Sequence, residues 1–171
     1  MTLSIIILAL VTVQRLGELV LAQRNTARLL ARGAVEVGAG HYPLIVVLHG
    51  AWLAGLWALG WDQPISLPWL ALFIALQLMR VWVIATLGER WTTRIVVLPG
   101  APLVRRGPYR FLDHPNYAVV VAEIAVLPLA FGLVGFAVLF SGLNATVLWI
   151  RIRAESRALR TMGPDGLQAA P

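Results

Sequence analysis

The sequence has no cysteine and no lysine, and few of its side chains are charged. The lack of cysteine excludes disulfides, thiolate catalysis and cysteine-ligated metal sites. Charged residues make up only 13% of the 171 positions, whereas 59% are hydrophobic and the mean hydropathy is +0.79. A soluble domain needs more polar residues than this to cover its surface, so the composition excludes a water-soluble globular domain. It predicts a single all-α integral membrane domain over residues 1–171.

Five apolar stretches approach the ~20 residues that a transmembrane helix needs. We predict spans at about residues 3–22, 43–61, 67–87, 115–131 and 133–150, with a long loop at 88–114 and a tail at 151–171. The last two spans are short, and we separate them because Pro128, Gly132 and Gly135 interrupt the apolar run. One long, tilted helix is the alternative.

All fourteen positive charges are arginine, and their positions predict the orientation. Cytoplasmic loops of membrane proteins carry an excess of arginine. Five spans place twelve of the fourteen on one side, whereas four spans would move the tail arginines across the membrane. We therefore predict a multi-pass protein of the bacterial inner (plasma) membrane, with its N-terminus outside and its C-terminus in the cytoplasm. The net charge of +6 then reflects topology and attraction to lipid headgroups, and we expect no nucleic-acid partner.

Four ionisable residues lie inside the predicted spans, namely Arg15, Glu18, Arg80 and Glu123. Each costs ~2.5 to 3.5 kcal/mol at a span centre, so they should be paired or should line a wet cavity. Arg15 and Glu18 are close enough to pair within one helix. Glu123 has no cation in its own span, so we predict that it lines a polar pocket open to the cytoplasm and contacts the substrate. A purely structural ion-pair cluster is the alternative.

The predicted loop at 88–114 is the candidate ligand-binding segment. Five proline and glycine residues between Pro99 and Pro108 favour a fixed, extended path with free backbone groups. A group of aromatic and hydrogen-bonding residues follows where the fourth span begins: Tyr109, His114, Pro115, Asn116 and Tyr117. Taken singly, each is as easily a surface or interfacial side chain. Together they predict a site on the cytoplasmic side.

These residues carry a family resemblance. The run Leu103-Val104, then GPYR from Gly107, HPNY from His114 and RIRAE from Arg151 resembles the isoprenylcysteine carboxyl methyltransferase family and the related phospholipid methyltransferases. The resemblance covers about residues 80–160 and implies an integral membrane enzyme that uses S-adenosylmethionine and releases S-adenosylhomocysteine. Residues 18–48 also resemble a bacterial branch associated with type III polyketide synthases, which implies alkylpyrone-type lipid substrates.

The resemblance also implies roles for individual residues. Arg151 matches the family arginine at the substrate, where we expect it to be catalytic. The implied cofactor contacts are Ala101, Pro102, Leu103, Val104, Tyr109, His114, Pro115, Asn116, Tyr117 and Glu155. Asp113 and Ser156 stand where the family commonly has arginine and glutamate, which changes the local charge but removes no position needed for methyl transfer. We expect no metal ligands.

The chemistry of these residue types agrees with the resemblance. Methyl transfer from a sulfonium to an oxygen needs alignment and an ionised acceptor, and no covalent enzyme intermediate. Arg151 is permanently charged and can hold a carboxylate or enolate by two hydrogen bonds. Glu155, four residues later on the same helix face, can accept hydrogen bonds from the cofactor. We predict methyl transfer to the carboxylate or enol oxygen of a lipophilic substrate in the membrane.

Three alternatives stand beside this prediction. Arg151 and Glu155 have the spacing of an ordinary helical salt bridge. A membrane reductase of the steroid-reductase type has a similar architecture and would bind NADPH instead. A small transporter subunit would use the buried charges to line a path. The sequence leaves the acceptor and the oligomeric state open.

Overall fold

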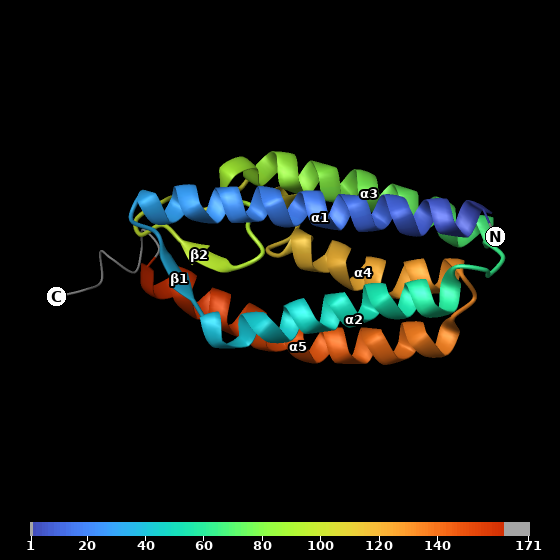
Figure 1. The fold of residues 1–171 in the computed structure, drawn as a ribbon. Helices are drawn as coiled ribbons and strands as arrows, with labels where there is room; N and C mark the ends of the chain where they lie inside the picture. The colour runs from blue at the N-terminus through green and yellow to red at the C-terminus, as the bar shows by residue number, and fades with distance from the viewer. Residues whose placement is uncertain (1, 163–171) are drawn as a thin grey trace.

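The structure, a computed structural model, describes residues 2–162 and consists mainly of helices that run alternately in opposite directions (Figure 1). The helices are α1 (Thr2–Ala31), α2 (Tyr42–Gly60), α3 (Leu67–Leu87), α4 (Pro115–Ala130) and α5 (Val134–Met162). All except α4 are long and apolar enough to cross a membrane, and α4 is a shorter apolar helix. The chain is therefore a mostly helical membrane protein, as its composition predicts. The predicted tail from residue 163 onward lies outside the described residues.

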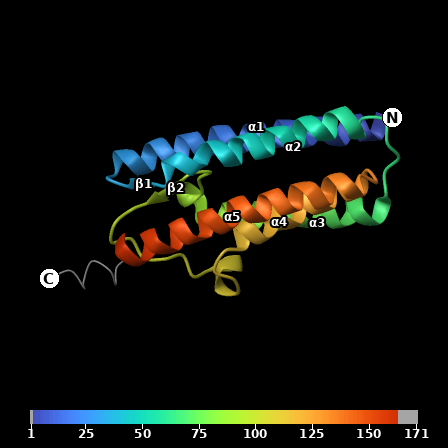
Figure 2. The ribbon, with the colours of Figure 1, turned by 90° about the horizontal axis from the view of Figure 1, so that it is seen from below.

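The helices form two layers. Helices α1 and α2 form one layer, and α4 lies between α3 and α5 in the other (Figures 1 and 2). The core between the layers contains Leu8, Trp52, Leu56, Ile124, Leu127 and Phe131, all less than 3% exposed. With 16 residues, α4 is only about 24 Å long and is shielded by its neighbours. A polar side chain on α4 can therefore face protein instead of lipid.

The interruption near residue 130 is a tight turn between two helices. Pro128 lies in the last turn of α4, and Gly132 then adopts a φ of 70°, which glycine allows at little cost. The Leu133 amide donates back to the Pro128 carbonyl, which closes the turn. The stretch 115–150 therefore forms two antiparallel helices, and the alternative of one long helix is wrong.

The loop at 88–114 contains the main departure from an all-α prediction. Strand β2 (Ile95–Val97) pairs antiparallel with β1 (Val35–Val37), which follows α1. Short 3-10 turns at Ala39–His41, Gly88–Arg90 and Gly107–Arg110 flank these segments. Ile95 and Val97 are buried against Ala158 of α5, so the small sheet ties the loop to the last helix.

Most of the arginine residues gather at one end of the bundle. The end of α1, the two strands and the end of α5 lie together there, opposite the N-terminus (Figure 1). Helix α1 continues for nine residues past the predicted span, to Ala31, and exposes Arg28 and Arg32 beside Glu89 at 3.5 and 3.2 Å. Helix α5 likewise continues to Met162 and carries the last described arginines out of the apolar region.

Candidate active site

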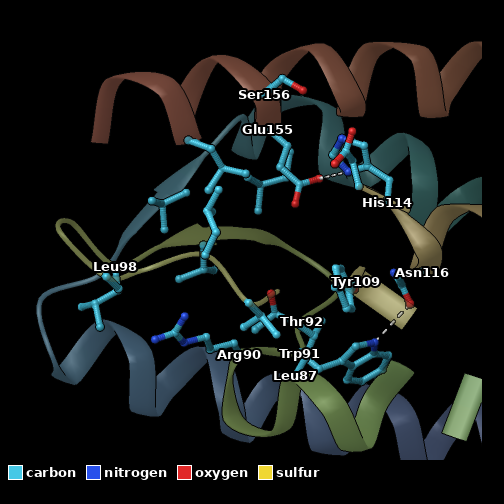
Figure 3. A pocket seen from close by; sticks show the side chains of 18 of the residues that line it. Leu87, Arg90, Trp91, Thr92, Leu98, Tyr109, His114, Asn116, Glu155 and Ser156 are labelled. Atoms are coloured by element: carbon cyan, nitrogen blue, oxygen red, sulfur yellow. Dashed lines mark hydrogen bonds and ion pairs between the residues drawn. The ribbon is translucent and has the colours of Figure 1, made fainter. Parts of the chain in front are cut away.

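A cavity of about 720 Å³, which we call the loop cavity, lies between the loop 88–114 and the last turns of α5 (Figure 3). The predicted site residues that line it are Ala101, Pro102, Leu103, Val104, Tyr109, His114, Asn116, Tyr117, Arg151 and Glu155. Pro115 is not among them, because it starts α4 with its ring fully buried. The structure thus brings ten of the predicted positions to one cavity, although they come from three separate segments.

Glu155 projects from α5 toward the start of α4 (Figure 3). The Tyr117 hydroxyl donates a 2.5 Å hydrogen bond to its carboxylate, and His114 Nδ1 lies 3.8 Å from the same oxygen. The His114 and Tyr117 rings are stacked with their centroids 5.5 Å apart. The carboxylate is therefore held by α4, while 28% of the side chain stays accessible from the cavity.

The opposite side of the loop cavity is formed by Trp91 and its partners. The Trp91 indole donates to Asn116 at 3.3 Å, and the Trp91 carbonyl accepts from Asn25 of α1 at 2.8 Å. Tyr109 packs near this tryptophan. Burial, and to a smaller extent the Glu155 carboxylate, raises the pKa of Tyr109 above its ordinary value. Its hydroxyl therefore stays protonated at neutral pH and is available as a donor.

Arg151 is buried and has no carboxylate as an ion-pair partner among residues 2–162. The residue is 4% exposed, one guanidinium nitrogen donates to the Thr93 carbonyl at 2.9 Å, and Nε has no hydrogen-bond partner among residues 2–162. It forms no ion pair with any carboxylate of residues 2–162, because Glu155 is turned toward Tyr117 and His114. The helical salt bridge suggested by the spacing is therefore not formed. A buried charge without a counter-ion is unfavourable, so this position suits an anionic ligand.

A second cavity of about 350 Å³, which we call the membrane cavity, lies between α1 and α2. Its walls are largely apolar, and include Leu16, Leu19, Ile45, Val46, Leu53 and Leu148. It shares Trp91, Thr92, Asn116, Tyr117 and Arg151 with the loop cavity. A space reached from the basic end and a space within the apolar bundle thus meet at the buried guanidinium of Arg151.

The four predicted intramembrane charges form one buried charge cluster. Glu123 accepts hydrogen bonds from Arg80, from Arg15 at 2.9 Å and from Gln77 at 2.8 Å. Glu18 accepts from Arg15 at 3.0 Å, as its spacing predicts, and from Arg80 at 3.2 Å. Arg15, Glu18 and Arg80 line the membrane cavity, but Glu123 lies behind them and reaches neither cavity. Arginines on two other helices occupy both Glu123 carboxylate oxygens, and the contact of Glu123 with the substrate stays a prediction.

The sequence profile of the isoprenylcysteine carboxyl methyltransferase family matches residues 69–161. The chain belongs to this family. An uncharacterized protein of Bacillus subtilis, YpbQ, is 40% identical over 160 residues, which cover 91% of this chain and 95% of that protein. An uncharacterized protein of Haemophilus influenzae is 26% identical over 156 residues, covering 88% and 91%. No solved structure matches the chain.

Membership of the isoprenylcysteine carboxyl methyltransferase family makes the chain a membrane methyltransferase. The family match includes α4, α5 and nearly all of the loop cavity, whereas α1 and α2 lie outside it. The membrane cavity is therefore walled largely by segments that the profile does not describe.

Two contributors to these cavities were not predicted from the sequence. The Thr93 carbonyl fixes Arg151, and the run of β-branched residues after Arg94 was the available signal for the strand beside it. His49 of α2 lines the membrane cavity and is a further titratable side chain within a predicted span. A single histidine in an apolar run gave no spacing pattern from which a site could be inferred.

Proposed function

We propose that the protein is an S-adenosylmethionine-dependent O-methyltransferase that acts on a carboxylate or enolate of a lipophilic substrate. The observation that carries this proposal is the position of Arg151, which is buried without an ion-pair partner in residues 2–162, where the two cavities meet. A lipid anion in the membrane cavity would bring its oxygen to this guanidinium. A polar cofactor in the loop cavity would then face the same point.

The loop cavity suits S-adenosylmethionine in size and in chemistry. Its volume of about 720 Å³ falls within the ~300 to 1,000 Å³ of small-molecule sites. The partly accessible Glu155 carboxylate can accept hydrogen bonds from amino or ribose groups, and His114, Tyr109 and Asn116 add polar contacts. The backbone of residues 101–104 would form the third side, held by a 2.6 Å hydrogen bond from Arg90 to the Pro102 carbonyl.

When bound, S-adenosylmethionine supplies an electrophilic methyl group on a sulfonium. The chain itself contributes charge, position and exclusion of water. Arg151 favours the ionised form of an acceptor oxygen, because a permanent positive charge nearby stabilises the anion. The Thr93 carbonyl and the Tyr117 ring, whose centroid lies 5.9 Å from the guanidinium carbon, hold Arg151 in place. The apolar walls keep water away, which strengthens the electrostatic interaction.

We further propose that the basic end of the bundle faces the cytoplasm in the plasma membrane. This orientation follows the arginine excess at that end and gives the loop cavity access to a soluble cofactor. A lipid would enter the membrane cavity laterally, between α1 and α2. Anionic headgroups would contact exposed arginines such as Arg28 and Arg32.

The test is cofactor binding followed by methyl transfer in purified protein. We expect calorimetry in detergent to detect S-adenosylhomocysteine and not NADPH. Labelled S-adenosylmethionine should transfer its methyl group to at least one member of a panel of fatty acids, alkylpyrones and prenylated peptides. Binding of NADPH alone would favour a reductase, and binding of neither ligand would favour a transporter subunit.

A further inference from the structure

The membrane cavity has a polar zone far from Arg151. On α4, Tyr117 lies at the junction of the cavities and Glu123 anchors the buried charge cluster. These two residues are six positions apart, which is about 9 Å along a helix. Arg15 and Glu18 of the cluster line the cavity at this depth, with side chains 18% and 12% exposed. An unsubstituted hydrocarbon chain would form no hydrogen bonds with the polar side chains of this zone.

The buried charge cluster contains more charge than its own stability requires. Arg80 alone donates two hydrogen bonds to Glu123 and neutralises it. Arg15 and Glu18 add a second ion pair from α1, and placing each charge in the membrane is costly. Arg15 Nε has no hydrogen-bond partner within residues 2–162. The Arg15–Glu18 pair is therefore not needed to neutralise Glu123, and it adds polar groups at the cavity wall.

His49 adds a polar group from α2. Its Nδ1 lies 2.8 Å from the Ile45 carbonyl, and a carbonyl only accepts, so Nδ1 carries the proton. Neutral imidazole then presents Nε2 as an acceptor, and no hydrogen bond to Nε2 forms among the described residues. Within one cavity, α1 thus offers arginine donors and α2 offers a free acceptor. A hydroxyl group, which both donates and accepts, matches this pair.

We infer that the methyl acceptor is a lipid anion with a hydroxyl group on its chain, about 9 Å from the oxygen that receives the methyl group. The hydroxyl donates to His49 Nε2 and accepts from the Arg15 side of the buried charge cluster. This inference rests on the proposed function, because Arg151 fixes the other end of the substrate. His49 and Arg15 are specificity residues in this scheme, and both lie outside the family match at residues 69–161.

The experiment uses the full-length protein in lipid nanodiscs, with tetradecanoic acid and a positional series of its monohydroxy derivatives. Two readouts are taken: kcat/KM for methyl transfer, and displacement of a bound fluorescent fatty acid, which needs no turnover. We expect one mid-chain position to exceed the unsubstituted acid about tenfold in both readouts, the effect of one buried hydrogen bond. Positions near either end of the chain should show no such preference.

Variants of α2 connect the preference to His49. In His49→Leu the ratio of hydroxylated to plain acid should fall to about one, and His49→Gln, which keeps an acceptor, should restore part of it. Val47→Leu is the matched control, because Val47 is 68% exposed on the same helix and does not line the cavity. An equal affinity for all acids in the wild-type protein, or an unchanged ratio in His49→Leu, overturns the inference.

The two readouts separate this inference from the proposed function. Methyl transfer without any positional preference supports the proposed function and rejects the hydroxyl site. Positional preference in displacement, lost in His49→Leu, with no methyl transfer to any acid supports the hydroxyl site and rejects the proposed function.

Discussion

The Tyr117 hydroxyl donates a 2.5 Å hydrogen bond to the Glu155 carboxylate and thereby joins α4 to α5 across the loop cavity. The contact holds the carboxylate in the loop cavity and away from Arg151. We expect Tyr117→Phe to weaken S-adenosylhomocysteine binding about tenfold, because hydrogen bonds to charged groups contribute ~1.5 to 3 kcal/mol. Glu155→Ala should weaken it more. Calorimetry measures both, and the exposed Phe111→Leu is the control. Full affinity in Glu155→Ala would reject the cofactor assignment.

Arg151 should affect turnover more than cofactor affinity. We expect Arg151→Gln to lower kcat by about two to three orders of magnitude, the usual loss when one charge-stabilising donor is removed. The affinity for S-adenosylhomocysteine should change by less than about threefold, because the proposed cofactor contacts come from other side chains. Arg151→Lys should recover only part of the rate, since a lysine cannot reproduce the two-point geometry. A wild-type rate in Arg151→Gln would contradict the assignment.

The buried charge cluster makes a prediction about stability. Glu123→Leu should destabilise the protein by about 3 to 5 kcal/mol, because it leaves two arginines sharing one carboxylate in a buried site. The double variant Arg80→Met with Glu123→Leu should recover most of this loss, since it leaves the neutral Arg15–Glu18 pair. Thermal unfolding in detergent gives the comparison. A double variant less stable than both single variants would show that the charges are not coupled as the structure indicates.

Gly107 is required where the loop approaches α3. Its φ is +56°, and a Cβ there would lie 2.5 Å from Thr86 Oγ1. We expect Gly107→Ala to destabilise the turn at Gly107–Arg110 by ~1 to 3 kcal/mol, the usual cost of such backbone strain. Trypsin cleavage at the neighbouring arginines should become faster. Gly142→Ala, in α5 with open space around it, should cleave at the wild-type rate. Equal cleavage in the two variants would argue against a tight fit at Gly107.

The orientation is open to a reporter test. C-terminal fusions after residue 162 should be active with a cytoplasmic reporter and inactive with a periplasmic one, because the proposed topology has five crossings after an external N-terminus. The opposite pattern would reject the arginine-based topology. Fusions after Trp61 provide the internal control, since that residue should lie outside.

The membrane helices were predictable because each depends on a local run of apolar residues. The pairing of Arg15 with Glu18 was predictable for the same reason, since three positions separate them on one helix. The cation that Glu123 contacts depends on which helix packs against α4, and that is a property of the assembled bundle. The pairing of β1 with β2 joins segments 58 to 62 residues apart through three residues each. Strands this short carry little periodic signal, so their partner could not be inferred.

The candidate site was predictable as a set of residues but not as an arrangement. The motifs at 101–104, 107–117 and 151–155 indicated which residues gather, and the cavity contains nearly all of them. The spacing of Arg151 and Glu155 suggested a mutual salt bridge, whereas Tyr117 and His114 hold the glutamate instead. Sequence spacing predicts which residues share a helix face. It does not predict which side chains of another helix they contact.

The charge state of Arg151 also bears on how product leaves. An anionic lipid would be drawn to a buried guanidinium that has no carboxylate of its own among residues 2–162. Once the lipid oxygen carries a methyl group, the lipid is neutral, and the ion pair that held it no longer exists. Under the proposed function, the same arginine would bind the substrate tightly and the ester or enol ether weakly. A neutral product would then partition back into the bilayer from the membrane cavity, so turnover would need no separate mechanism to expel it.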